Sequence, residues 1–143
     1  MKYKFLGLII AVALIGCYSC QKEPKKGEYK GVFKGRYETD TSSTTYTTNY
    51  YFNVTHSTKK ELRLQEKQSK ITSVLKKYDK DSISGSIGFG GIYNPDGDIS
   101  VGFSFITITG RYDKETITGS FSTTFGDKNK EYLSEGNFII SAY

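Results

Sequence analysis

The chain's only two cysteines, Cys17 and Cys20, stand three positions apart near the N-terminus. Their thiols could carry covalent chemistry, so the surrounding residues decide what that chemistry is. Lys2 and Lys4 come first, and residues 5–15 follow without a charged side chain. A positive start and a short apolar run are typical of an export signal peptide. The run is too short to span a bilayer, which takes roughly 20 residues. The cysteines therefore lie where an exported chain is processed.

The residues just before the first cysteine, Leu14-Ile15-Gly16-Cys17, resemble the lipobox of bacterial lipoproteins. In that motif an aliphatic residue, a tolerant position and a small residue precede the cysteine that receives diacylglycerol. The resemblance implies that Cys17 is lipidated. Cys20 is the alternative, because lipidation of Cys17 leaves an odd thiol in an oxidising compartment. Cys20-Gln21-Lys22-Glu23 also resembles the polar start of surface lipoproteins of the Bacteroidota type.

Lipidation would fasten the chain to a membrane, because each buried methylene contributes about 0.8 kcal/mol and two or more acyl chains hold firmly. The resemblance implies a signal peptide at 1–16 and a lipidated tether at 17–26. It also implies a place at the bacterial outer membrane, on its periplasmic or cell-surface face. The resemblance therefore predicts that the protein binds a membrane through a lipid anchor.

Catalytic groups are scarce in the rest of the chain. His56 is the only histidine, and it continues the alternation of Tyr50, Phe52 and Val54, which favours a polar residue at the end of a strand over a catalytic base. No cysteine lies in the domain itself, and the Gly-x-Ser-x-Gly pattern of a nucleophile elbow is absent from the sequence. We therefore expect a protein that is not an enzyme.

No metal or other cofactor is expected either. A zinc site needs three or four His, Cys or carboxylate ligands, and the chain has too few of the first two. Asn94, Asp96 and Asp98 could offer oxygens to calcium, which takes six to eight ligands. The sequence Asn94-Pro95-Asp96-Gly97-Asp98 is better explained as a turn, because Pro presets one turn angle and Gly accepts a positive φ.

The charge does not indicate a nucleic-acid partner. The formal net charge of +5 falls to +3 when Lys2 and Lys4 leave with the signal peptide (5 − 2 = 3), and no nucleic-acid-binding motif is present. Lys59 to Lys80 carries eight basic residues against Glu61, Glu66 and Asp79. We interpret this stretch as a solvated, basic surface that could contact a protein partner.

Alternating residues predict an all-β domain. From Gly27 to Tyr37 the even positions are charged except for Val32, and the odd positions are glycine or aromatic, which is the period of a strand. Thr, Tyr and Phe, which favour strands, are abundant throughout. The predicted strands are 28–38, 45–55, 60–66, 70–78, 82–89, 99–110, 115–125 and 131–142.

An internal repeat supports this assignment. Lys77–Ile87 aligns without gaps on Arg111–Phe121 at an offset of 34, and six of the eleven positions are identical. A polar stretch followed by alternating residues predicts a hairpin turn that leads into a strand. The alignment favours a strand over a helix at 70–78, whereas a short helix or turn within 57–68 stays possible.

Eight successive strands with short links favour a single antiparallel up-and-down β-barrel over 27–143, with a two-sheet β-sandwich as the alternative. Apolar residues change from odd to even positions near Phe105 and Ile106, which predicts a bulge there. The arrangement resembles the lipocalin or calycin class. Gly27-Glu28-Tyr29 and Gly35-Arg36-Tyr37 are similar to the Gly-x-Trp near the start of the first lipocalin strand, although this chain has no Trp.

The resemblance implies a membrane-anchored, non-enzymatic module that binds a hydrophobic or amphipathic small ligand inside the barrel. An eight-stranded barrel can hold one small ligand or can be filled by its own side chains. A filled core would leave a surface interaction or structural lipoprotein as the alternative function. The residues predicted to line a ligand are Tyr37, Tyr50, Phe52, Phe103, Phe105, Phe121 and Tyr132.

Overall fold

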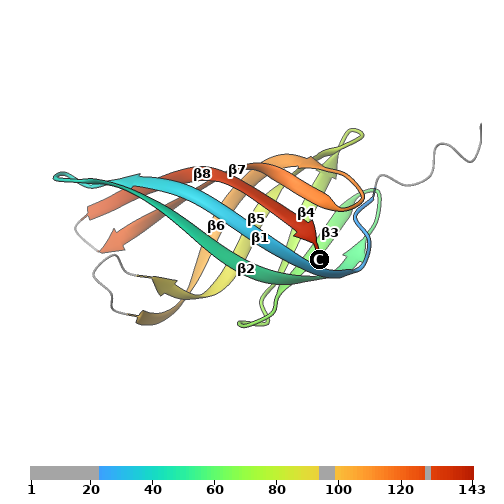
Figure 1. Cartoon of the computed structure of the whole chain (residues 1–143), viewed down its shortest axis with the longest axis horizontal. Coiled ribbons are helices and arrows are strands. Elements are labelled where there is room, and N and C mark those ends of the chain that lie inside the picture. Colours follow the sequence, from blue (N-terminus) through green and yellow to red (C-terminus); the bar gives the residue numbers. More distant parts are fainter. Residues whose placement is uncertain (1–22, 94–98, 128–129) are drawn as a thin grey trace, which may run out of the picture.

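The chain folds into a closed barrel of antiparallel strands that follow one another in sequence order (Figure 1). This computed structural model describes residues 23–93, 99–127 and 130–143. The predicted all-β, up-and-down barrel is confirmed, and the two-sheet sandwich is not found. The strands are β1 (Gly27–Glu38), β2 (Ser43–Ser57), β3 (Glu61–Glu66), β4 (Thr72–Tyr78), β5 (Ser82–Tyr93), β6 (Ile99–Tyr112), β7 (Thr116–Asp127) and β8 (Lys130–Ala142).

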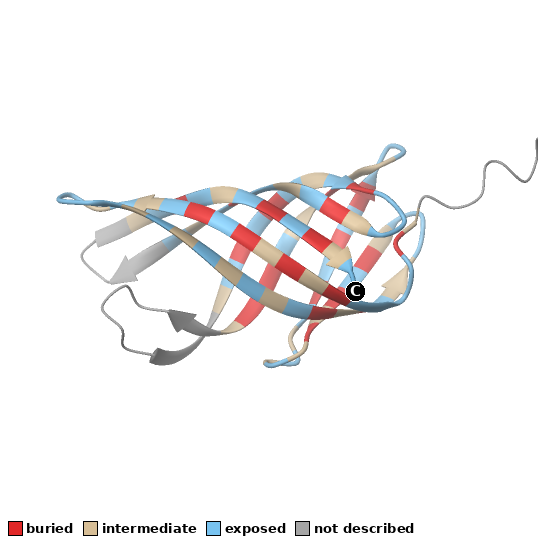
Figure 2. Cartoon of the chain, viewed as in Figure 1, coloured by how far each residue is buried: buried red, intermediate tan, exposed pale blue. Residues whose placement is uncertain are grey.

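Closure comes from β1, which pairs with β2 on one side and β8 on the other. Buried and exposed residues alternate along the strands (Figure 2), because successive side chains point to opposite faces of a sheet. The predicted strand at 70–78 is confirmed as β4. No helix forms between β2 and β3, where the Thr58 hydroxyl accepts hydrogen bonds from the N–H groups of Lys60 and Glu61 in a turn. No helix among the described residues is long and apolar enough to cross a membrane.

The two ends of the barrel differ. We call the end that carries residues 23–26, the turn 113–115 and Tyr143 the closed end (Figure 1, right). We call the end that carries the β1–β2 turn at 39–42 the open end (Figure 1, left). The wall is uneven, because β3 and β4 have 6 and 7 residues whereas β2 has 15. The β3–β4 hairpin therefore stops well short of the open end.

Phe33 of β1 lies at the centre of the core. Its side chain is buried, and its ring stacks on Phe138 with centroids 5.5 Å apart. Further rings contact it edge-on or at a tilt at centroid distances of 5.6 to 6.5 Å: Tyr50, Phe52, Phe89 and Phe121. These rings come from β2, β5, β7 and β8, so the Phe33 ring packs against four other strands of the barrel.

A buried lysine lies at the closed end. The Lys77 side chain is 0% exposed, and its ammonium donates hydrogen bonds to Ser57 Oγ at 3.2 Å and to the Thr58 carbonyl at 2.7 Å. The ammonium also lies 4.6 Å from the centre of the Tyr112 ring, a cation–π contact. It completes its bonding with an ion pair to Glu23.

Two residues before β1 thus belong to the barrel. Glu23 pairs with Lys77, and Pro24 is fully buried, although the sequence places both in the tether at 17–26. The hydroxyl of Tyr29 donates a hydrogen bond to the Lys25 carbonyl at 2.9 Å, which holds the next residue as well. Residues 23–25 are therefore fixed to the closed end of the barrel.

Two expectations about side-chain direction are wrong. Phe105 is 59% exposed on the outside of β6, beside Gly88 and Ile71, rather than inside the barrel. The irregularity in register lies at the open end, between Gly90 and Ile92 of β5. The even positions of β6 therefore already face inward at Ile106.

The second wrong expectation concerns the basic stretch from Lys59 to Lys80. This stretch is not one solvated surface, because Lys77 points into the barrel.

The repeat forms two hairpins, as predicted, but their registers differ by one residue. Tyr78 pairs with Ser82 in the first hairpin, whereas Tyr112 pairs with Ile117 in the second. A shift of one residue moves a side chain to the other face of the sheet. Tyr78 is accordingly exposed and Tyr112 buried, although they occupy the same place in the repeat.

We expect Phe33→Ala to lower the free energy of unfolding by about 3–5 kcal/mol, the usual cost of removing a buried ring. Phe105→Ala is the matched control, and because that ring is on the outside it should cost less than about 1 kcal/mol. Urea denaturation followed by circular dichroism measures both values. Similar losses at the two positions would contradict the assignment of Phe33 to the centre of the core.

We expect Lys77→Met and Glu23→Gln each to lower the free energy of unfolding by about 1–3 kcal/mol, because each leaves a buried or half-buried partner behind. The double variant should lose less than the sum of the two, since the pair is then removed as a unit. Lys76→Met, a change at the neighbouring outward-facing lysine, is the control and should stay within about 0.5 kcal/mol. Additive losses in the urea denaturation cycle would show that the two groups are not coupled.

Candidate functional site

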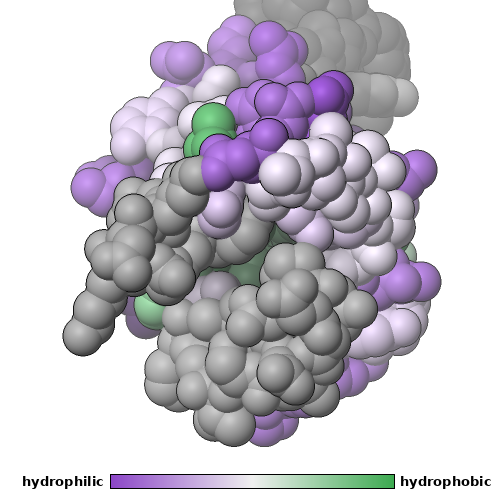
Figure 3. Space-filling view, turned by 90° about the vertical axis from the view of Figure 1, so that its left-hand side faces the viewer, coloured by the Kyte–Doolittle hydropathy of each residue, from purple (hydrophilic) through white to green (hydrophobic). Residues whose placement is uncertain are grey.

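The interior opens into a cup at the open end of the barrel. Along β2 the inward-facing side chains change from buried at Phe52 and Val54 to partly exposed toward the β1–β2 turn. The partly exposed ones are Thr44, Tyr46, Thr48 and Tyr50. Figure 3 looks onto this end and shows a hollow with hydrophobic surface at its floor.

Aromatic rings form the wall and floor of this cup. The Tyr50 ring lies 4.0 Å from the Phe89 ring, measured between centroids, and links β2 with β5 across the interior. On the other side, the Tyr46 hydroxyl is 2.7 Å from Ser134 Oγ of β8, and the Tyr46 ring lies 6.2 Å from that of Tyr37. The cup therefore presents phenol and hydroxyl groups above a floor of Phe rings.

Gly35 makes room for this arrangement. A Cβ atom at Gly35 would overlap the Tyr46 ring and crowd the Phe121 ring. Because glycine has no Cβ, Tyr46 can lie across β1 and reach Ser134. The mixture of small and aromatic residues in the sequence is therefore an interlocking set at this position.

Burial controls the ionisation of the groups near the cup. It raises the pKa of the Tyr50 phenol, with the Thr48 hydroxyl acting in the opposite direction, so the phenol stays neutral at physiological pH. Burial also tends to raise the pKa of Glu66, but hydrogen bonds from Ser69 and Gln68 outweigh it and the pKa lies below its ordinary value. Glu66 stays ionised, and its carboxylate accepts the N–H groups of the β3–β4 turn.

The predicted ligand-lining residues are divided by the structure. Tyr37 and Tyr50 contribute to the cup, whereas Phe52 and Phe121 are buried in the floor. Tyr132 is partly buried on β8. Phe105 lies outside the barrel.

Other predicted sites cannot be placed in the same way. The Phe103 side chain falls outside the described residues, as do both candidate lipidation sites, Cys17 and Cys20, and the turn at 94–98. In the described part of the chain, no group of three or more His, Cys, Asp or Glu side chains could hold a metal ion. His56 lies with its Nε2 atom 3.5 Å from the Glu61 carboxylate and is partly exposed.

Tyr46, Phe89 and Ser134 belong to the cup but were not among the predicted ligand-lining residues. Phe89 could have been found by extending the alternation of Ile83 and Ile87, since all three are buried on β5. Ser134 shares the alternation of Phe138 and Ile140, which places it inside the barrel. Its hydrogen bond could not be predicted, because it depends on the approach of the Tyr46 hydroxyl from β2.

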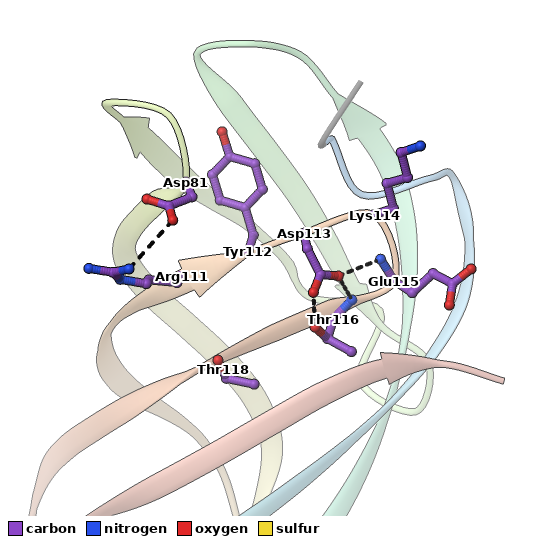
Figure 4. Close-up of a pocket in the computed structure, with 8 residues that line it drawn as sticks. All are labelled: Asp81, Arg111, Tyr112, Asp113, Lys114, Glu115, Thr116 and Thr118. Atoms are coloured by element: carbon purple, nitrogen blue, oxygen red, sulfur yellow. Dashed lines mark hydrogen bonds and ion pairs between the residues drawn. The ribbon is translucent and has the colours of Figure 1, made fainter. Parts of the chain in front are cut away.

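Two depressions lie on the outside of the barrel. The first, of about 570 Å³, surrounds the β6–β7 turn (Figure 4). There the Asp113 carboxylate accepts hydrogen bonds from the N–H groups of Glu115 and Thr116 and from the Thr116 hydroxyl. These bonds hold the pKa of Asp113 below its ordinary value, so this carboxylate closes the turn.

The second depression, of about 450 Å³, lies over the glycine pair Gly35 and Gly136 between Lys34, Arg36 and Glu135. Its rim consists of exposed side chains, and Tyr46 of the cup also lines it. In the cup, apolar rings and hydroxyl groups come together.

Comparisons with known proteins add no relative: no family model, no curated protein and no solved structure matches the chain.

Proposed function

We propose that the protein is a membrane-anchored, non-enzymatic lipoprotein whose barrel binds a hydrophobic or amphipathic small ligand in the aromatic cup. The observation that supports this most is the change along β2 from fully buried Phe52 to partly exposed Tyr50 and Tyr46. A ligand site combines apolar surface with a few polar groups that orient the ligand. The cup has both, as Phe rings below and phenol hydroxyls above.

Binding rather than catalysis fits the side chains available. The described groups of the cup are phenols, hydroxyls and apolar rings, and the nearby Glu66 carboxylate is already bonded to its own turn. Those groups can hold a ligand but offer no free base to accept a proton from it.

The anchor is proposed from Leu14-Ile15-Gly16-Cys17. With Cys17 lipidated and Glu23 fixed to Lys77 at the closed end, the lipid and the cup lie at opposite ends of the barrel. The cup then opens away from the bilayer of the outer membrane, toward the periplasm or the cell surface.

A second candidate function is a surface interaction lipoprotein without a small ligand. The rings around Phe33 fill the middle of the barrel, so the binding volume is confined to the open end. In this function the outer face carries the activity through a partner protein.

We expect the fatty-acid analogue dansyl-undecanoate to bind in the cup. Tyr50→Ala should weaken its affinity about 2- to 10-fold, because an aromatic contact contributes about 0.5–1.5 kcal/mol. The neighbouring Tyr51, which is 43% exposed on the outer surface, gives the matched control Tyr51→Ala, which should bind as the wild type does. Fluorescence titration measures the affinity. If the wild-type protein does not bind the probe, the second candidate function is favoured.

We expect Cys17→Ala to abolish incorporation of radiolabelled palmitate in bacterial cells and to release the protein from the membrane fraction. Cys20→Ala should keep both the label and the membrane association. The opposite result would assign the anchor to Cys20, and an unlabelled wild-type protein would contradict the lipoprotein proposal.

A further inference from the structure

Part of β2 pairs with a strand on one side only, within the described residues. β3 pairs with β2 from Phe52 to Ser57, whereas β1 pairs with it from Ser43 to Val54. Among the residues that the structure describes, Ser43–Tyr50 therefore borders a gap in the wall above the β3–β4 hairpin. The hairpin ends there because the Glu66 carboxylate and the positive φ of Lys70 form a tight turn.

The backbone along this gap is ready to pair. The Tyr51 carbonyl accepts the N–H of Lys67 at 2.8 Å, so the backbone of Tyr51 faces the β3 side. Backbone groups alternate in direction along an antiparallel strand. The N–H and C=O groups of Thr45, Thr47 and Asn49 thus point into the gap, and all three residues are exposed.

This edge lacks the protection that edge strands usually have. Charged residues, prolines and bulges normally keep a free edge from pairing with another chain. Ser43–Tyr50 contains no charged residue and no proline, and its register with β1 is unbroken. The stretch can therefore accept another strand without charge repulsion or a missing donor.

The cup determines which strand would fit. Thr44, Tyr46, Thr48 and Tyr50 face inward beside the same edge. Side chains of an added strand would alternate in the same way, so every second one would enter the cup next to Tyr46 and Tyr50. Apolar side chains suit those positions, because the Tyr50 and Phe89 rings lie below them.

We propose that the edge of β2 at Ser43–Tyr50 binds an extended peptide segment of another protein as an added antiparallel strand. Apolar side chains at alternate positions of that peptide enter the cup, and the intervening ones face solvent. A second copy of this chain fits less well, because the inward side chains of its own β2 edge are held in its own barrel, as Tyr46 is by Ser134. This binding mode uses the backbone edge and does not require the small ligand proposed above.

The probe for the test is a fluorescein-labelled peptide of alternating Thr and Phe with a Lys at each end, bound to the full chain in detergent. In antiparallel pairing the Thr residues, which face solvent, direct their N–H groups at β2. N-methylation of the Thr residues should therefore weaken binding at least 10-fold, and N-methylation of the Phe residues should leave it unchanged. Equal effects of the two methylation patterns, or no binding of the unmodified peptide in fluorescence polarisation, would overturn the proposal.

A pair of protein variants tests the same edge. Thr47→Pro removes an N–H that points into the gap, and we expect at least a 10-fold loss of peptide affinity, whereas the isosteric Thr47→Val keeps the N–H and the affinity. Dansyl-undecanoate should bind to both variants equally, which separates this proposal from the small-ligand function. Sedimentation of the wild type as a dimer that Thr47→Pro converts to a monomer would overturn the proposal, because a second copy would then occupy the edge.

Discussion

Pairing between β1 and β8 is the constraint on which the other features depend. Tyr29–Tyr37 pairs with Ser134–Ala142, and this turns a sheet with two edges into a barrel with one interior. Closure places Phe33 of β1 opposite β5 and β7, so that rings from several strands meet around it. The packed middle then separates a closed end, where Lys77 and Glu23 pair, from an open end that keeps a cup.

The number, order and approximate bounds of the strands could be predicted, because alternation is strong in this chain and turn residues separate the segments. The direction of individual side chains was less accessible. For Phe105 it depends on where the register of β5 and β6 becomes irregular, and both parities carry apolar residues nearby. Since the irregularity lies near Gly90, Phe105 faces outward, and only the pairing with β5 reveals it.

The internal repeat shows a similar limit. In the first hairpin Asp79 has a positive φ of 53°, and Tyr78 pairs with Ser82. In the second, Asp113 accepts hydrogen bonds from the turn, and Tyr112 pairs with Ile117. The same polar sequence therefore forms turns that differ by one residue. This difference places Lys77 inside the barrel and its counterpart Arg111 outside. Residue types alone could not predict it.

The uneven wall leaves space for the proposed binding site in a barrel whose middle is filled. If β3 and β4 were as long as β2, the cup would be enclosed on that side and the β2 edge would be paired along its length. The β3–β4 turn, held by Glu66, stops the wall at Tyr51. Beyond it, no described strand pairs with β2 on that side, next to the Tyr46 and Tyr50 side chains. Apolar surface, hydroxyl groups and exposed strand backbone thus occur together at the end opposite residues 23–26.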